Sequence, residues 1–144
     1  MYDKIVVGTD GSPTALKAVA HAASLAAATG ANLHIAMVTP SIPVVVAPDM
    51  LLASAEWSDA TKQATHAALE SAAEAAAAAG AETTTHQLSG DPADALLSLC
   101  DDIDADLLVV GSRGMHGARR FLLGSVSSRC AHHANRSVLI VHTD

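Results

Sequence analysis

Segments typical of buried strands alternate with segments typical of helices along the whole chain. The strand-like segments cover 4–8, 32–38, 82–88, 106–110 and 137–142, and the helix-like ones begin at Pro13, 54, Pro92 and Ser125. Strict alternation of this kind is typical of a parallel sheet with helices on both faces. The run 107–110 holds only leucine and valine, as expected of a strand covered on both faces. The sequence therefore predicts an α/β fold with one open sheet of five parallel strands.

Capping residues predict where the helices begin and end. Ser12 followed by Pro13 is a typical helix start, and Gly30 is a typical helix end. Asp91 and Pro92 repeat the start signal for a helix over about 92–100, and the last predicted helix covers about 125–133.

Alanine dominates two of the predicted helices. In the first, the residues at helical spacing that predict the buried face are Leu16, Val19, Ala20, Ala23 and Ala27. The run over 54–79 is predicted as one long helix ended by Gly80, because alanine has the highest helix propensity. Its charged side chains can face water.

A proline-rich segment separates the second strand from the long helix. Pro40, Pro43 and Pro48 predict an irregular loop over 39–50, because proline is excluded from helix interiors and central strands. Two interpretations of this Pro40 to Pro48 loop stay open. It is either a flap packed on the sheet edge, or a lid over a ligand or a partner contact.

The length of 144 residues predicts a single domain, 1–144, with one core region. No segment approaches the roughly 18 apolar residues of a membrane span. The start of the chain lacks a basic region followed by an apolar one, so we expect a cytoplasmic protein. Cys100 and Cys130 form no CxxC pair and are predicted to be buried thiols in a reducing compartment.

Charge and aromatic content argue against a nucleic-acid partner. The formal net charge is −7, whereas binding to a nucleic-acid backbone needs clustered lysine and arginine. Only 2% of the residues are Phe, Trp or Tyr, which leaves little material for base stacking.

A glycine motif follows the apolar strand 107–110. Gly111 and Gly114 are separated by two residues, and nine more precede the pair Gly124 and Ser125. A strand that ends in glycines presents backbone N–H groups, and a helix that begins at Ser125 adds unpaired amides and a partial positive charge. This combination suits an anion such as phosphate. The alternative is that these glycines only turn the chain.

Ligands of open parallel sheets sit beyond the carboxyl ends of the strands, where the strand order reverses. If the strands 4–8 and 106–110 are neighbours there, the turn Gly8 to Asp10 and the turn Gly111 to Gly114 face the same crevice. Two loops that are distant in sequence would then form one site.

Three segments of the chain resemble the universal stress protein family, and specifically its ATP-binding branch. They are Gly8-Thr9-Asp10-Gly11-Ser12, Val109-Val110-Gly111-Ser112-Arg113-Gly114 and Leu123-Gly124-Ser125-Val126-Ser127. The resemblance extends from Tyr2 to Val141. It implies a strand order of 3-2-1-4-5, a relative of the nucleotide-binding α/β folds.

The resemblance also implies roles for individual positions. Thr9 and Asp10 would approach the ribose and phosphates, the backbone of Val38 would meet the adenine edge, and Val110 would line the base or ribose wall. The residues expected to hold ribose and phosphates are Gly111, Gly114, Gly124, Ser125, Val126 and Ser127. Within the motif, Arg113 is the better placed of three arginines to offset phosphate charge, while Arg119 and Arg120 fit a solvated loop equally well.

The implied cofactor is ATP, with Mg²⁺ arriving on the nucleotide. Asp10 would accept a hydrogen bond from ribose, act on Mg²⁺ from its outer shell, or only cap the following helix. No P-loop sequence GxxxxGK[ST] is present, and no nucleophile or base is implied by position. The histidines near Cys130 do not predict a zinc site, because their side chains would point in different directions.

The last predicted strand is an apolar sheet edge, which favours pairing with another chain. The resemblance likewise implies a homodimer through Val138 to Val141. Three functions stay open at this point: a nucleotide-dependent regulatory or stress-response module, a weak Mg²⁺-dependent ATPase or phosphotransferase, and a dimeric interaction protein that binds no nucleotide. The intact glycine motif favours the first over the third.

Overall fold

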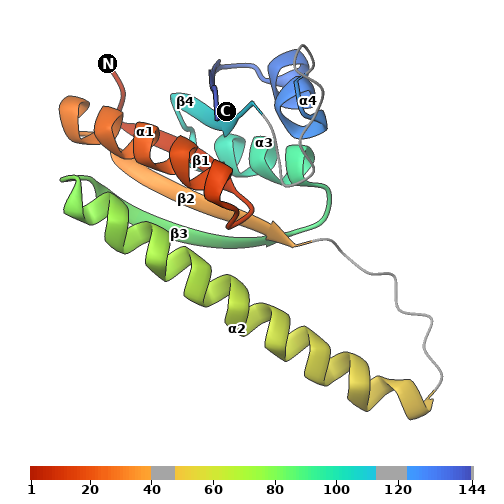
Figure 1. Ribbon diagram of the computed structural model, residues 1–144. Coiled ribbons are helices and arrows are strands. Elements are labelled where there is room, and N and C mark those ends of the chain that lie inside the picture. Colours follow the sequence, from red (N-terminus) through yellow and green to blue (C-terminus); the bar gives the residue numbers. More distant parts are fainter. Residues whose placement is uncertain (40–47, 113–122, 144) are drawn as a thin grey trace.

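The computed structural model describes residues 1–39, 48–112 and 123–143. For 48–57 it describes the backbone only. The elements in these ranges are β1 (Lys4–Thr9), α1 (Pro13–Thr29), β2 (Asn32–Thr39), α2 (Pro48–Ala78), β3 (Glu82–Ser89), α3 (Pro92–Ile103), β4 (Leu107–Gly111), α4 (Ser125–His133) and β5 (Ser137–Val141). Strands and helices alternate as the sequence predicts (Figure 1).

The strands form one sheet with the order β3-β2-β1-β4-β5, and every neighbouring pair is parallel. This confirms the expected order 3-2-1-4-5. Val7 of β1 pairs with Ile35 of β2 on one side and with Val109 of β4 on the other. Because β2 and β3 extend the sheet in one direction and β4 and β5 in the other, the strand order reverses between β1 and β4. This is the switch point at which open sheets bind ligands.

Helices cover both faces of the sheet (Figure 1). Alternate residues of each strand point to opposite faces, so Ile5 and Val7 of β1 pack in a first core with α1 and α2. Val6 packs in a second core with α3 and α4. Cys100 and Cys130 are buried in the second core, where burial raises the pKa of each thiol to about 11.

The capping residues act as predicted at α1 and α3. Ser12 Oγ accepts the Ala15 N–H at 3.2 Å, and Gly30 ends α1 in the left-handed conformation with φ 76°. Asp91 Oδ2 accepts the Asp94 N–H at 3.0 Å. The helix α3 continues to Ile103, three residues beyond the predicted end.

The strand β2 includes Thr39 and the helix α2 begins at Pro48, so the prediction of irregular structure over 39–50 is wrong for its first residue and for its last three. Proline is accepted there because the first residue of a helix needs no intrahelical N–H bond. The centre of the Pro40 to Pro48 loop lies outside the described residues. In the ranges that the structure describes, no helix is long and apolar enough to cross a membrane.

Candidate functional site

The candidate site is the edge of the sheet where the carboxyl ends of β1 and β4 meet, and we call this edge the crevice. Thr9 ends β1 and Gly111 ends β4, and the two strands pair directly in parallel. The following turns therefore leave the sheet at the same edge, which confirms that the two strands are neighbours. The turns that the sequence analysis placed together thus start from adjacent strands.

The turn after β1 is held by its own side chains. Thr9 Oγ1 accepts the Gly11 N–H at 3.1 Å, and Asp10 Oδ1 accepts the Ser12 N–H at 2.9 Å. Gly11 has φ 80°, a left-handed conformation that favours glycine. Ser12, rather than Asp10, provides the N-cap of α1. The Asp10 side chain is exposed beyond the strand, where a carboxylate can accept hydrogen bonds from a ligand hydroxyl.

A backbone hydrogen bond closes the glycine motif. The Gly124 N–H donates to the Ser112 carbonyl at 2.8 Å, although 113–123 separate the two residues. Ser127 Oγ donates to the Gly124 carbonyl at 3.0 Å and to the Ser112 carbonyl at 3.4 Å. The end of β4 and the start of α4 therefore lie side by side at the crevice.

The start of α4 presents backbone amides without a capping side chain. Gly124 occupies the N-cap with φ −60° and ψ 160°, and it has no side chain to accept a first-turn N–H. The first turn of α4 also contains no acidic residue. The amides and the positive end of the helix dipole are thus available for an anion.

A group of buried hydroxyls supports this arrangement from inside the fold. Thr143 donates its backbone N–H to Ser112 Oγ at 3.3 Å, and its hydroxyl lies 3.5 Å from the same oxygen. Lys17 Nζ donates to the Thr143 carbonyl at 3.2 Å. Neither Thr143 nor Lys17 was predicted from the sequence to have a role. The sequence signal for Ser112 is its place between Gly111 and Gly114 in the glycine motif, whereas Thr143 lies in no motif.

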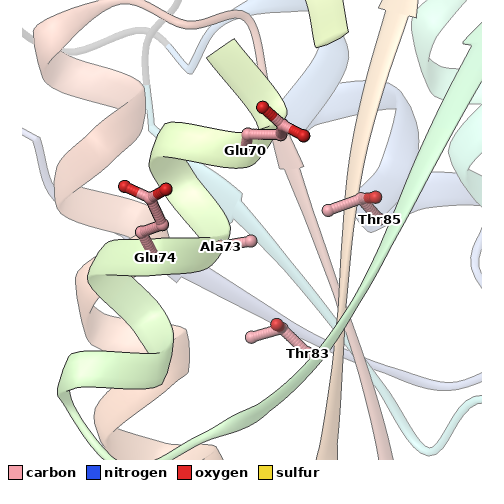
Figure 2. A pocket seen from close by; sticks show the side chains of 5 residues that line it. All are labelled: Glu70, Ala73, Glu74, Thr83 and Thr85. Atoms are coloured by element: carbon pink, nitrogen blue, oxygen red, sulfur yellow. The ribbon is translucent and has the colours of Figure 1, made fainter. Parts of the chain in front are cut away.

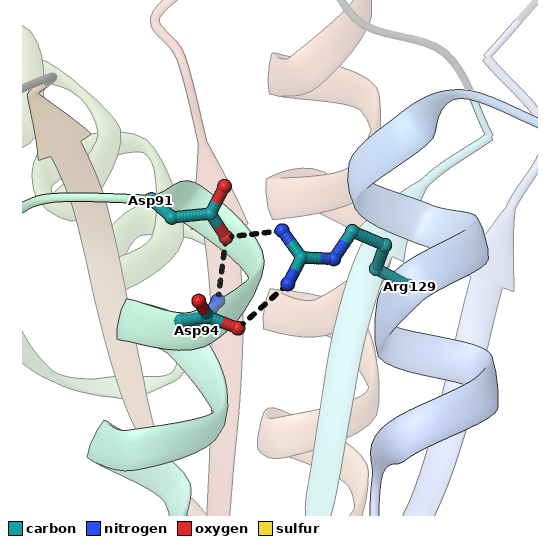
Figure 3. Close-up of polar contacts among 3 residues, drawn as sticks. All are labelled: Asp91, Asp94 and Arg129. Atoms are coloured by element: carbon teal, nitrogen blue, oxygen red, sulfur yellow. Dashed lines mark hydrogen bonds and ion pairs between the residues drawn. The ribbon is translucent and has the colours of Figure 1, made fainter.

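An arginine on α4 holds this helix against the start of α3 (Figure 3). Arg129 Nη1 lies 2.8 Å from Asp91 Oδ2, and Arg129 Nη2 lies 3.0 Å from Asp94 Oδ1. Asp91 Oδ2 also accepts the Asp94 N–H, so one carboxylate oxygen serves both contacts. Arg113, Arg119 and Arg120 were the arginines considered from the sequence, and Arg129 was not predicted to have a role. The two acidic residues at the start of α3, Asp91 and Asp94, are the sequence signal that could have predicted a basic partner such as Arg129.

The remaining predicted positions fall in different surroundings. Val110 is buried in the second core, and Val126 and Val38 are half-buried against it. Val38 lies one residue beyond the last β1–β2 pair, which joins Thr9 and Met37. Ser125 is exposed at the first position of α4. Arg113, Gly114, Arg119 and Arg120 lie outside the described residues.

A hollow of about 380 Å³ lies elsewhere, between α2 and β3 (Figure 2). The residues that line it are Glu70, Ala73, Glu74, Thr83 and Thr85. Two carboxylates repel phosphate, so this hollow does not suit the ligand that the crevice fits. Across 1–39, 48–112 and 123–143, no group of three or more His, Cys, Asp and Glu side chains is arranged to hold a metal ion.

A five-stranded parallel sheet with helices on both faces, and with Gly111 and Gly124 of the glycine motif at its switch point, defines an open α/β protein of the doubly wound class. The family model described as "Universal stress protein family" matches residues 1–142, so the chain belongs to this family.

Similar proteins support the assignment along the full length. Universal stress protein Rv1636 of Mycobacterium tuberculosis is 36% identical over 148 residues, which cover 99% of this chain and 97% of the relative. A crystal structure of a universal stress protein in complex with cAMP is 38% identical with a TM-score of 0.76, and the match covers 99% of this chain and 98% of that one. The universal stress protein of Archaeoglobus fulgidus in complex with dAMP is 25% identical with a TM-score of 0.67, and covers 96% and 97%.

Proposed function

We propose that this chain is a nucleotide-dependent regulatory module that binds ATP, with Mg²⁺ carried on the phosphates. The observation that carries the proposal is the Gly124 N–H to Ser112 carbonyl bond, because it brings both halves of the glycine motif to the switch point. The cAMP and dAMP complexes of similar proteins support an adenine nucleotide as the ligand class.

The proposed pose follows the elements around the crevice. The phosphates lie at the start of α4 against Gly111, Gly124 and the Ser125 to Ser127 turn, and the family resemblance assigns Arg113 and Gly114 to the same phosphate site. Asp10 and Thr9 face the ribose side. The backbone of Val38 lies at the adenine edge, since β2 extends past its last pair with β1. The side chain of Val110 is buried in the second core and supports the wall of the site beside the base or ribose.

In this proposal occupancy, rather than turnover, is the signal. Bound nucleotide would add contacts between the β1 turn, the end of β4 and the start of α4, and so change the affinity for a partner. The proposal includes a homodimer through Val138 to Val141 of β5 and a cytoplasmic location, where reducing conditions keep the buried thiols Cys100 and Cys130 free.

The first test is direct detection of ligand. The purified protein is denatured and any released nucleotide is identified by mass spectrometry. Calorimetric titrations with ATP, AMP and cAMP, each with and without Mg²⁺, then measure affinity. Saturable binding of an adenine nucleotide is expected, with the tightest binding for MgATP. Absence of binding by all three nucleotides would refute the proposal.

A negative charge added at the start of α4 tests the pose. In Ser125→Asp the new carboxylate repels phosphate, so ATP affinity should fall at least about tenfold, or about 1.4 kcal/mol. The fold should persist, because an acidic residue in the first turn stabilises a helix by about 0.3–1 kcal/mol. Ser24→Asp, which adds the same charge at an exposed position in the middle of α1, is the matched control and should bind as the wild type does. Equal affinity in both variants would place the phosphates elsewhere.

A further inference from the structure

Two histidines on neighbouring strands contact each other on the sheet. His34 of β2 and His86 of β3 bring Nδ1 and Nε2 to 2.9 Å, and their rings stack with centroids 5.1 Å apart and an interplanar angle of 26°. Both side chains are half-buried. His34 points to the same face as Ala36, which packs in the second core, whereas Leu33 and Ile35 pack in the first.

The sheet fixes the positions from which these two rings project. The register pairs Ala36 with His86 and His34 with Thr84, so the histidines are diagonal neighbours on adjacent strands. Asn32 and Thr84 lie on the same face, where Thr84 Oγ1 donates to Asn32 Oδ1 at 3.2 Å. The backbone positions of the two imidazoles are therefore set by strand pairing rather than by a loop.

The ring nitrogens are available as ligands at neutral pH. Burial lowers the pKa of His34, with further contributions from His86 and Lys4, and burial lowers the pKa of His86. A hydrogen bond between the two rings needs one nitrogen with a proton and one with a free lone pair. Each uncharged ring carries one proton. When these protons are on His34 Nε2 and His86 Nδ1, the facing nitrogens His34 Nδ1 and His86 Nε2 both have free lone pairs. This change of tautomer releases no proton from the pair.

The distance between these nitrogens is close to that of two ligands on one metal ion. With zinc–nitrogen bonds of about 2.0–2.1 Å, two nitrogens at right angles or at the tetrahedral angle lie about 2.8–3.4 Å apart. The present distance of 2.9 Å already falls within this span. The two nitrogens now face each other almost in line, because centroids 5.1 Å apart are near the longest separation that an N···N distance of 2.9 Å allows. Each ring therefore has to turn by roughly 35–45° to aim its lone pair at a shared ion.

We propose that His34 and His86 form a two-imidazole site for a divalent ion of the Zn²⁺, Ni²⁺ and Cu²⁺ class. Imidazole nitrogen suits these ions better than it suits Mg²⁺ or Ca²⁺. Because no third His, Cys, Asp or Glu joins the pair among the residues that the structure describes, water completes the coordination. The half-buried rings leave room for that water. The site lies in mid-strand, apart from the glycine crevice, and does not depend on the proposed nucleotide.

Other histidines provide the controls. On α2, His66 Nε2 lies 3.0 Å from Glu70 Oε1. In the described ranges, this is a second place where a histidine contacts a side chain that can bind a metal ion. Both of these side chains are well exposed. His66→Gln therefore removes a competing site without touching the sheet. His34→Gln and His86→Gln each remove one of the proposed ligands.

Calorimetric titration with Zn²⁺ tests the site on the nucleotide-free protein. One ion per chain is expected for the wild type and for His66→Gln. His34→Gln and His86→Gln should each weaken binding roughly tenfold or more, since even the loss of an outer-shell partner costs that much. Circular dichroism and thermal unfolding check that each variant is folded. Wild-type affinity in His34→Gln or His86→Gln, or loss in His66→Gln alone, would overturn the proposal.

A spectroscopic measurement on the wild type keeps the test independent of folding in the variants. Cu²⁺ is added below one equivalent and its electron paramagnetic resonance spectrum is recorded. The superhyperfine pattern of two equatorial imidazole nitrogens is expected. A pattern from one nitrogen, or from none, would show that the two rings do not share the ion.

Discussion

Asp106 connects the first strand to the fourth near the chain start. Its Oδ2 accepts the backbone N–H groups of Asp3 at 2.7 Å and of Lys4 at 2.9 Å. These hydrogen bonds hold the pKa of the exposed Asp106 carboxyl below its usual range. The hydrogen bond from Lys4 makes the larger contribution to this shift, and the one from Asp3 the next largest. We expect Asp106→Ala to lower the free energy of unfolding by about 1 kcal/mol, as measured by urea denaturation at neutral pH.

The pH dependence of this effect has a defined sign. Because the folded pKa of Asp106 is lowered, its contribution to stability is complete above the unfolded pKa and is lost as the pH falls through the folded value. The difference between wild type and Asp106→Ala should therefore shrink in acid. Asp102→Ala is the control, since the Asp102 side chain is exposed and makes no hydrogen bond or ion pair within the described ranges. An equal loss in both variants would contradict this role.

At the same scale, the sequence predicted capping residues better than the buried face of α1. Ser12, Pro13 and Gly30 act as expected, because caps depend on local backbone geometry. Val19 and Ala23 are buried as predicted, together with Ala15, Ala18, Ala22 and Ala26, whereas Ala20 and Ala27 are exposed. Leu16, predicted to be buried, is 43% exposed. A helix with alanine on most sides has weak hydrophobic contrast, so the sheet and α2 decide which side is covered.

Between elements, the Arg129 contacts couple α4 to α3. All three side chains are about half exposed or more, so the interaction is modest and screened by salt. A double-mutant cycle with Arg129→Gln and Asp94→Asn should give a coupling energy of about 0.5 kcal/mol at low ionic strength. Asp94 is the better partner for the cycle, because Asp91 also caps α3. The measurement is urea denaturation of the wild type and the three variants.

Ionic strength supplies the control for this cycle. The coupling should fall when the titrations are repeated in high salt, whereas a packing effect of the long Arg129 side chain would persist. A coupling energy of zero at low salt would mean that α4 is held by the second core alone. Its residues Cys130 and Val126 would then position the start of α4.

For whole elements, the predicted types are correct and the errors concern boundaries. α2 starts at Pro48 instead of 54, and α3 ends at Ile103 instead of about 100. Proline at a first helical position looks the same in sequence as proline in a loop. Asp104 ends α3 with a left-handed φ of 54°, a conformation that glycine usually marks. The start of α2 and the end of α3 therefore carry no distinctive local signal in the sequence.

At the scale of the molecule, the two sheet edges differ in character. The β5 edge is apolar, with Val138, Leu139 and Ile140 half-buried, whereas β3 is rich in threonine. If two copies pair along β5, its outward amides should exchange hydrogen more slowly at high protein concentration than at low. Hydrogen exchange by mass spectrometry measures this, and sedimentation velocity gives the mass.

The strand β3 serves as an internal control for the dimer. Its amides should exchange at a rate independent of protein concentration, because a polar edge is a poor pairing surface. Concentration-dependent protection in β3 but not in β5 would move the interface to the opposite edge. A monomer mass at every concentration would refute the homodimer.

The sequence by itself determined the number, type and order of the elements and, through the resemblance, the strand order 3-2-1-4-5. Periodicity, caps and turn residues act over a few positions, so they can be found without a structure. Only the tertiary structure decided which distant residues meet: Gly124 with Ser112, Arg129 with Asp91, and His34 with His86. These contacts depend on strand register and helix placement, which the whole core sets together. No local pattern in the chain specifies them.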